Sequence, residues 1–395
     1  MRFRLETERE NLFDVNMVIA MRVRIEGEVP FEQLEKAFHK TVDAYEILNS
    51  RIVIEDNGDA FYVDCENPGS SFKESLLGFE DLINANEKVR FRIEEGEYIR
   101  GFLSPDGIFF LMHHLGGDGK SLLYFIETFM SILSGEEIEK VPFANLPVSG
   151  LPADSGMPYL YKLFVKSWNK RWTKMKRVFN YEDMDEAYRK FWPTHKTKTV
   201  ITEYGKDALN DLLAGSKEAG CSLTAYLVAL WIREMPFMAD VGFAVDGRLS
   251  DERTMGNFAT GIHINYRYND KISVGENASK INKLMKKKLT DPKVRYSVLQ
   301  LIGNLDPTLI DTLSLEAIGA YHTSETARFA DIMCYGKNKR DLSITNLMKA
   351  DIRTEYGNFR IKDIAFVPPV VSYGTNLIGI ITVNDTLIVT RHIYE

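Results

Sequence analysis

One segment, residues 109–133, runs from an apolar strand through a glycine-rich turn into a helix. Phe109 to Met112 are all apolar, which is typical of a strand buried in a sheet. Three glycines within residues 116–119 let the backbone turn sharply and let another group approach closely. Apolar residues then recur at helical spacing up to Leu133, and Gly135 suits the helix end. The first half of the chain is therefore predicted to mix strands and helices.

The rest of the chain repeats this theme. Two hairpins are predicted in the first half, one at Asn57-Gly58 and one at residues 104–107. Pro30 is expected to open a helix, and Ser222 to cap another over residues 223–233. The second half predicts strands at 199–202, 241–245, 262–268, 342–346, 359–366 and 377–391, the last interrupted at Asn384-Asp385, and helices at 276–289 and 309–319. This pattern favours an α/β or α+β chain with two lobes, each a mixed sheet with flanking helices.

Residues 141–180 interrupt the pattern. Four prolines lie at the start, and a cationic stretch with two tryptophans follows at 166–177. We interpret residues 1–160 as an N-terminal lobe, 161–180 as a crossover and 181–395 as a C-terminal lobe. The cationic stretch has a second interpretation, contact with a partner or with the anionic part of a ligand.

Composition excludes several classes of protein. A net charge of −7 over 395 residues argues against nucleic-acid binding, which needs a concentrated basic surface. No run approaches the ~20 apolar residues of a membrane helix, and the charged N-terminus has no signal-peptide core. The 3 cysteines form no CxxC, so we expect reduced thiols in a cytoplasmic protein rather than a disulfide frame.

The apolar strand ends at His113 and His114, where candidate chemistry is concentrated. Neighbouring strand residues point to opposite faces, so the two imidazoles cannot both face one pocket if the strand continues through them. One is then structural and the other available. Histidine is the natural general base because its pKa lies near neutral pH.

Other interpretations of the same segment compete. Gly119-Lys120-Ser121 follows a strand as a phosphate loop does, but His114 stands where that motif needs its first glycine. The two histidines and Asp118 offer metal-ligand types in poor geometry, so no metal is predicted. The histidines can also simply be satisfied side chains at a strand end.

Residues 113–119, His-His-Leu-Gly-Gly-Asp-Gly, fit the HHxxxDG motif. On this motif the chain resembles the superfamily of chloramphenicol acetyltransferase and peptide-synthetase condensation domains. Further stretches resemble that superfamily in the expected order: 23–38, 223–231, 244–249, 255–259 and 343–347. No DFGWG-type sequence is present, which argues against the plant BAHD branch, and no carrier or adenylation sequence is attached.

The resemblance implies a tunnel between two chloramphenicol-acetyltransferase-like lobes, with His114 as general base. His114 would take the proton of a hydroxyl or amine acceptor as it attacks an acyl thioester, with no acyl-enzyme. His113, Asp118 and Gly119 would be structural, and Arg248 is the expected partner of Asp118. Ser343 and Asn346 are weaker candidates for stabilising the intermediate.

The resemblance also implies partners. An acyltransferase of this kind would hold no bound cofactor and would use acyl-CoA as co-substrate with a small-molecule acceptor. A condensation-type enzyme would instead take its acyl group from an acyl or peptidyl carrier protein, which the cationic stretch would help to dock. A non-catalytic binding module of the same fold is the third hypothesis.

Overall fold

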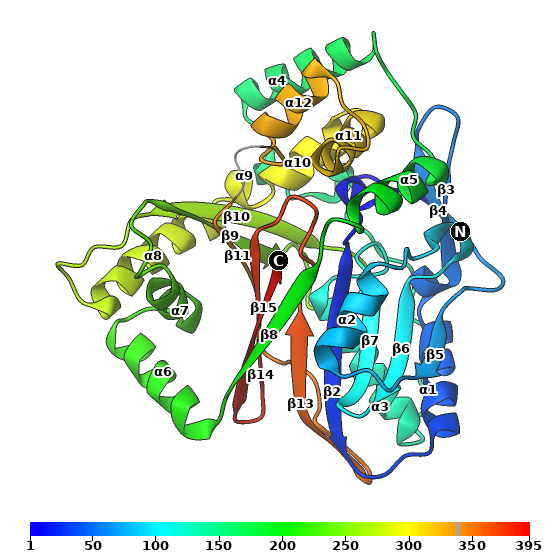
Figure 1. Cartoon of the computed structure of the whole chain (residues 1–395), viewed down its shortest axis with the longest axis vertical. Helices are drawn as coiled ribbons and strands as arrows, with labels where there is room; N and C mark the ends of the chain where they lie inside the picture. Colours follow the sequence, from blue (N-terminus) through cyan, green and yellow to red (C-terminus); the bar gives the residue numbers. More distant parts are fainter. Residues whose placement is uncertain (337–339) are drawn as a thin grey trace.

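In the computed structural model, which describes residues 1–336 and 340–395, two lobes lie side by side, with a cluster of helices at one end of them (Figure 1). Each lobe is built on a mixed sheet. A small third sheet joins β1 (Arg2–Arg4), β4 (Ala60–Asp64) and β3 (Ser50–Ile54). No helix in the described part of the chain is long and apolar enough to cross a membrane.

The first-lobe sheet carries the two histidines at the end of one strand. Its strand order is β12 (Glu355–Tyr356), β13 (Phe359–Val367), β2 (Val18–Glu26), β7 (Gly107–His113), β6 (Ile99–Ser104) and β5 (Ser71–Glu74). Helices α1 (Phe31–Ala44), α2 (Phe79–Glu87) and α3 (Gly119–Leu133) flank it. Phe110 of β7 packs against Phe125 and Phe129 of α3, with ring centroids 5.3 and 5.1 Å apart. Phe109, the preceding residue of the strand, contacts Phe79 of α2 instead, as strand alternation requires.

The second-lobe sheet has the order β10 (Ala259–Tyr266), β9 (Ala239–Asp246), β11 (Leu342–Lys349), β14 (Asn376–Val383), β15 (Thr386–Tyr394) and β8 (Thr197–Tyr204). Helices α6 (Lys206–Glu218), α7 (Leu223–Trp231) and α8 (Val274–Leu289) pack with it around a second apolar core. The hydroxyl of Ser222 accepts a hydrogen bond from the amide of Ala225, so the predicted cap of α7 is confirmed.

The cationic stretch forms the end of a helix. Helix α4 (Tyr159–Trp172) lies among α10 (Ser297–Asn304), α11 (Pro307–Ile318) and α12 (Ser324–Ile332) at one end of the molecule (Figure 1). Trp168 and Trp172 are buried in the larger core, and the Trp172 indole donates to Thr308 Oγ1 at 2.7 Å. The cations lie on the exposed face of the helix and just beyond it.

Strand β13 belongs to the first-lobe sheet although it comes late in the chain. It pairs antiparallel with β2, with Val367 opposite Ala20, and lies between β2 and the second-lobe strands (Figure 1). Its last five residues, 363–367, are all buried because both faces of the strand are covered. The mixed-sheet, two-lobe fold is thus as predicted. The proposed bounds, 1–160 for the N-terminal lobe, 161–180 for the crossover and 181–395 for the C-terminal lobe, stay a prediction. Strands β12 and β13 lie within the range proposed for the C-terminal lobe but belong to the first-lobe sheet.

A buried charge pair also ties the lobes together. His392 of β15 lies with its Nε2 3.0 Å from Glu87 of α2, and its Nδ1 lies 2.8 Å from the Pro368 carbonyl oxygen. Both side chains of the pair are buried. Burial by itself would lower the pKa of His392, but Glu87 and the Pro368 carbonyl outweigh it and raise the pKa above its ordinary value.

We expect His392→Gln to lower the free energy of unfolding by about 3–5 kcal/mol, because Glu87 would lose its buried partner. The raised pKa means that the pair stabilises the fold below the histidine pKa of the unfolded chain and fades as pH rises through the folded pKa. The loss should therefore be larger at about pH 6 than at about pH 9 in urea unfolding. An equal loss at both pH values would contradict this assignment.

Candidate active site

The strand β7 ends at His113, and the chain turns immediately after it. The amide of His114 donates to the Met17 carbonyl at 2.8 Å, and the amide of Gly116 donates to the His113 carbonyl at 2.8 Å. The turn leads into α3, whose first residue is Gly119. These contacts fix the direction in which each imidazole leaves the backbone.

His113 is a core residue. Its side chain is buried, its ring lies against Phe91, and its Nδ1 accepts a hydrogen bond from the Leu115 amide at 3.2 Å. Burial, together with the neighbouring positive charges, lowers the pKa of His113 to about 3. The imidazole is therefore neutral near physiological pH and serves the turn.

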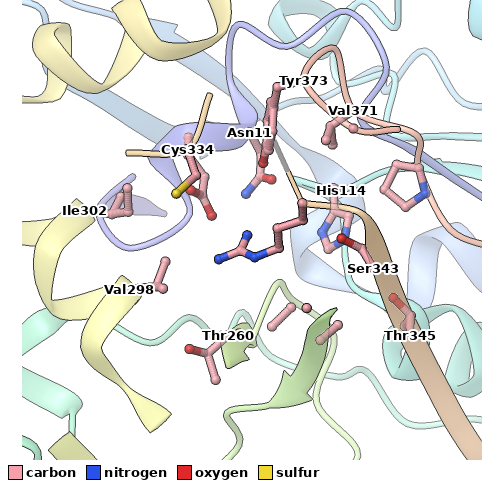
Figure 2. A pocket seen from close by; sticks show the side chains of 18 of the residues that line it. Asn11, His114, Thr260, Val298, Ile302, Cys334, Ser343, Thr345, Val371 and Tyr373 are labelled. Atoms are coloured by element: carbon pink, nitrogen blue, oxygen red, sulfur yellow. The ribbon is translucent and has the colours of Figure 1, made fainter. Parts of the chain in front are cut away.

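His114 instead lines a cavity of about 290 Å³ between the two lobes (Figure 2). This volume is near the lower end, about 300 Å³, of ordinary small-molecule pockets. The first lobe supplies residues of its N-terminal segment and His114. The second lobe supplies residues of β9, β10, β11 and α10. Thus His113 packs in the core and His114 faces the cavity; because β7 ends at His113, the turn rather than strand alternation separates the two side chains.

The protonation of His114 favours the neutral form. Burial lowers its pKa, and the negative charge of Asp118 and the side chain of Asn257 offset part of that effect. Its Nδ1 is buried and makes no hydrogen bond of ordinary geometry with the described residues. A neutral imidazole in a cavity can accept a proton near neutral pH.

Asp118 holds the turn to the second lobe. Arg248 donates through one nitrogen to Asp118 Oδ2 at 2.8 Å and through the other to Oδ1 at 3.1 Å. This is a two-pronged pair with both side chains buried, at 5% and 7% exposure. The guanidinium also stacks over the Phe258 ring, 4.4 Å from its centroid. Neither residue lines the cavity.

Asp118 has two further duties. Its Oδ1 accepts from the Ser121 amide at 2.9 Å, which caps α3. Its Oδ2 accepts from the Phe258 amide at 3.1 Å. The turn at residues 255–259 is thereby bound to the start of α3, and Ser121 Oγ donates to the Gly256 carbonyl at 2.8 Å. Asn257, in the middle of this turn, lines the cavity with His114.

Gly119 occupies a tight place where the two lobes meet. A Cβ there would come within 2.9 Å of Leu347 Cδ2 and 3.3 Å of Phe366 Cζ. Gly119 does not line the cavity. A side chain would therefore press on packing between the lobes rather than obstruct a tunnel.

The structure separates the two weaker candidates. Ser343 lines the cavity, whereas Asn346 does not. The Asn346 amide donates to Thr224 Oγ1 at 2.7 Å, and its oxygen accepts from the Met348 amide at 2.7 Å. Ser343 and Asn346 are three residues apart, so strand alternation points their side chains to opposite faces of β11. Of the two, only Ser343 is placed to contact a molecule bound in the cavity.

Sequence reasoning missed several cavity residues. Glu8 and Glu10 come from the N-terminal segment, and Arg340 and Tyr373 from loops of the second lobe. Nothing in the local pattern around these residues marks them, because they meet only in three dimensions. Asn257 lies within residues 255–259, one of the stretches that resemble the superfamily, and this resemblance was the one signal in the sequence that pointed to it. In the described residues there is no cluster of three or more His, Cys, Asp or Glu arranged for a metal.

Comparison with solved structures places this fold. The condensation domain of Monacolin K polyketide synthase MokA is 14% identical over 100% of this chain and 92% of that one, with a TM-score of 0.61. Trichothecene 15-O-acetyltransferase TRI3 from Fusarium sporotrichioides is 12% identical over 99% and 90%, with a TM-score of 0.62. Polyketide synthase associated protein 5 from Mycobacterium tuberculosis is 16% identical over 98% and 91%, with a TM-score of 0.61.

No protein-family model and no curated protein sequence matches the chain. The solved structures show that it has the two-lobed fold of condensation domains and chloramphenicol-acetyltransferase-like acyltransferases. The predicted resemblance of fold is therefore confirmed.

We expect Asp118→Asn to cost up to about 3–5 kcal/mol of stability, because it removes the buried carboxylate partner of Arg248 and leaves only the partly exposed Asp246, 3.1 Å away. Asparagine keeps the helix cap, so the loss measures the pair rather than the cap. The control is Lys206→Met, which removes an exposed pair with Asp385 that shares no partner with Arg248 and should cost about 0–1 kcal/mol. Urea unfolding measures both; similar losses would refute a special role for the buried pair.

Proposed function

We propose that this protein is an acyltransferase that moves an acyl group from a thioester to a hydroxyl or amine acceptor. The observation that carries the proposal is the neutral, cavity-facing His114, set between two lobes whose fold is that of acyl-transferring proteins. Acyl-CoA is the donor that we propose first.

In the proposed reaction His114 is the general base. It accepts the proton of the acceptor O–H or N–H as that atom attacks the thioester carbonyl carbon. The tetrahedral intermediate then collapses, the carbon–sulfur bond breaks, and the proton passes from His114 to the departing thiolate. The products are an ester or amide and a free thiol, and no acyl group is ever attached to the protein. The increase in rate comes from holding the base, the acceptor and the thioester close together in the right orientation.

Ser343 is proposed to assist. Its hydroxyl lines the same cavity as His114, from the strand β11 on the opposite lobe (Figure 2). A hydroxyl there can donate a hydrogen bond to the oxyanion of the intermediate, an interaction that is stronger in the transition state than in the ground state. Asp118 and Arg248 act only by holding the turn that carries His114.

One observation favours a carrier-bound donor as the second candidate. Lys166, Lys170 and Lys174 are exposed and lie at helical spacing along and just beyond α4. An acidic carrier protein would be attracted to such a surface. Kinetics with the same acyl group on CoA and on a carrier protein would separate the two, since a docking surface should lower KM only for the carrier.

We expect His114→Ala to lower acceptor-dependent thiol release by about 10²–10⁴-fold, the usual contribution of a general base. The assay follows free thiol from a panel of acyl-CoAs with mixed alcohol and amine acceptors. His39→Ala is the matched control because His39 is exposed on α1. Full activity in His114→Ala would show that another group is the base, whereas no release from any donor and acceptor pair would favour a carrier-bound donor or a non-catalytic binding module.

The pH profile gives an independent check. A base acts when it is unprotonated, and the pKa of His114 is lowered chiefly by burial. The acid limb of kcat/KM should therefore fall below the ordinary histidine pKa of about 6.5, with a plateau above it. An acid limb above pH ~7 would indicate another group as the base.

A further inference from the structure

A single arginine faces the cavity that holds His114. Arg340 is the only lysine or arginine among the described residues that line this cavity, and it comes from the second lobe just before β11. His114, Ser343 and Arg340 thus surround the same space. Neither the proposed transfer step nor the packing of the turn uses this charge.

The main chain around Arg340 is well anchored. Its carbonyl accepts from Thr375 Oγ1 at 2.7 Å. The next residue, Asp341, accepts the Asp240 amide on its carboxylate at 2.9 Å and is thereby tied to β9. Gly242 of β9 leaves room for the arginine stem, because a Cβ there would come within 2.8 Å of Arg340 Cδ. The side chain therefore leaves a fixed backbone across a glycine.

Within residues 1–336 and 340–395, the guanidinium of Arg340 has no carboxylate within ion-pair distance, and its Nε is buried without a hydrogen bond. An unpaired guanidinium that is partly withdrawn from water is costly, and the cost is recovered when an anion binds. The planar fork of arginine suits a carboxylate better than lysine does.

Two acids face the same cavity and must be weighed against this charge. Glu10 accepts a hydrogen bond from the Tyr335 hydroxyl at 2.8 Å, and burial raises the pKa of Glu10 although Tyr335 and Arg340 oppose the rise. Burial also raises the pKa of Glu8 to about 7, so this acid is partly protonated near neutral pH. The acids therefore offset the arginine only in part.

We propose that Arg340 binds a carboxylate of the small molecule that occupies this cavity, while another group of the ternary complex reacts at His114. The carboxylate can be carried by the acyl group or by the acceptor. The reaction at His114 rests on the proposed function, whereas the anion site itself does not.

The first experiment compares matched substrates. The donor arm uses succinyl-CoA against butyryl-CoA, and the acceptor arm uses a panel of hydroxy and amino acids against their neutral amides. We expect Arg340→Gln to lower the preference in kcat/KM for the carboxylate member by about tenfold in one arm, the worth of one charge-assisted hydrogen bond. Arg340→Lys keeps the charge and should retain part of the preference, which a purely structural role would not explain.

A second measurement needs no acyl transfer. Cys334 lines the same cavity (Figure 2), whereas Cys65 and Cys221 do not. Iodoacetate and iodoacetamide are similar in size and differ in charge. At Cys334, the rate of alkylation by iodoacetate divided by the rate by iodoacetamide should fall in Arg340→Gln. The same ratio should be unchanged at Cys65 and Cys221. Peptide mass spectrometry measures the rates at each cysteine.

The outcomes separate the two proposals. A falling ratio at Cys334 without any acyl transfer would support the anion site and count against the proposed function. Transfer that depends on His114, with neither the substrate preference nor the alkylation ratio changed in Arg340→Gln, would overturn the anion site and leave the proposed function standing.

Discussion

The buried pair of Asp118 and Arg248 is the interaction on which the candidate site depends. It joins the turn after β7 to the second lobe at 2.8 and 3.1 Å, and both partners lie outside the cavity. Because Asp118 also caps α3 and accepts the Phe258 amide, one carboxylate sets the helix, the turn and the neighbouring lobe together. The backbone of His114 is part of this turn, so the residue is held in place without a hydrogen bond from the Nδ1 of its imidazole. Its side chain is thus left free for a ligand.

The cavity combines groups whose charges are poorly matched. A neutral histidine, a cationic arginine and two buried acids face the same space, with Glu8 titrating near pH 7 because of its burial. Such arrangements cost stability in the empty protein and are typical of places where a ligand completes the pairing. On the exterior, positive charge gathers at Lys166 and Lys170 of α4 and at Lys174 just beyond it, all of which are exposed.

Local patterns predicted the elements well because they depend on local physics. Asn57-Gly58 forms the expected hairpin with Gly58 at φ +90°, and Asn384 takes the left-handed conformation in the turn between β14 and β15. The assignment of His114 rather than His113 to the cavity came from the resemblance, since β7 ends at His113 and alternation does not extend to His114. The pairing of Asp118 with Arg248 came from the resemblance, since nothing local relates two residues so far apart. The membership of β13 and the cavity position of Arg340 depend on contacts between distant segments, which single-sequence periodicity does not contain. Asn346 lies outside the cavity because it is three residues from Ser343, and strand alternation turns the two side chains to opposite faces.

The late arrival of β13 has a consequence for synthesis. The strand β2 spans Val18–Glu26, but its neighbour β13 spans Phe359–Val367. One edge of β2 must therefore wait, with its amides and carbonyls unpaired, until four strands of the second lobe, β8 to β11, have been synthesised. Domains usually fold one after the other as they emerge. Here the first lobe is completed only after most of the second-lobe sheet has been made, so a product that is terminated before β13 would expose an open sheet edge and be prone to aggregate.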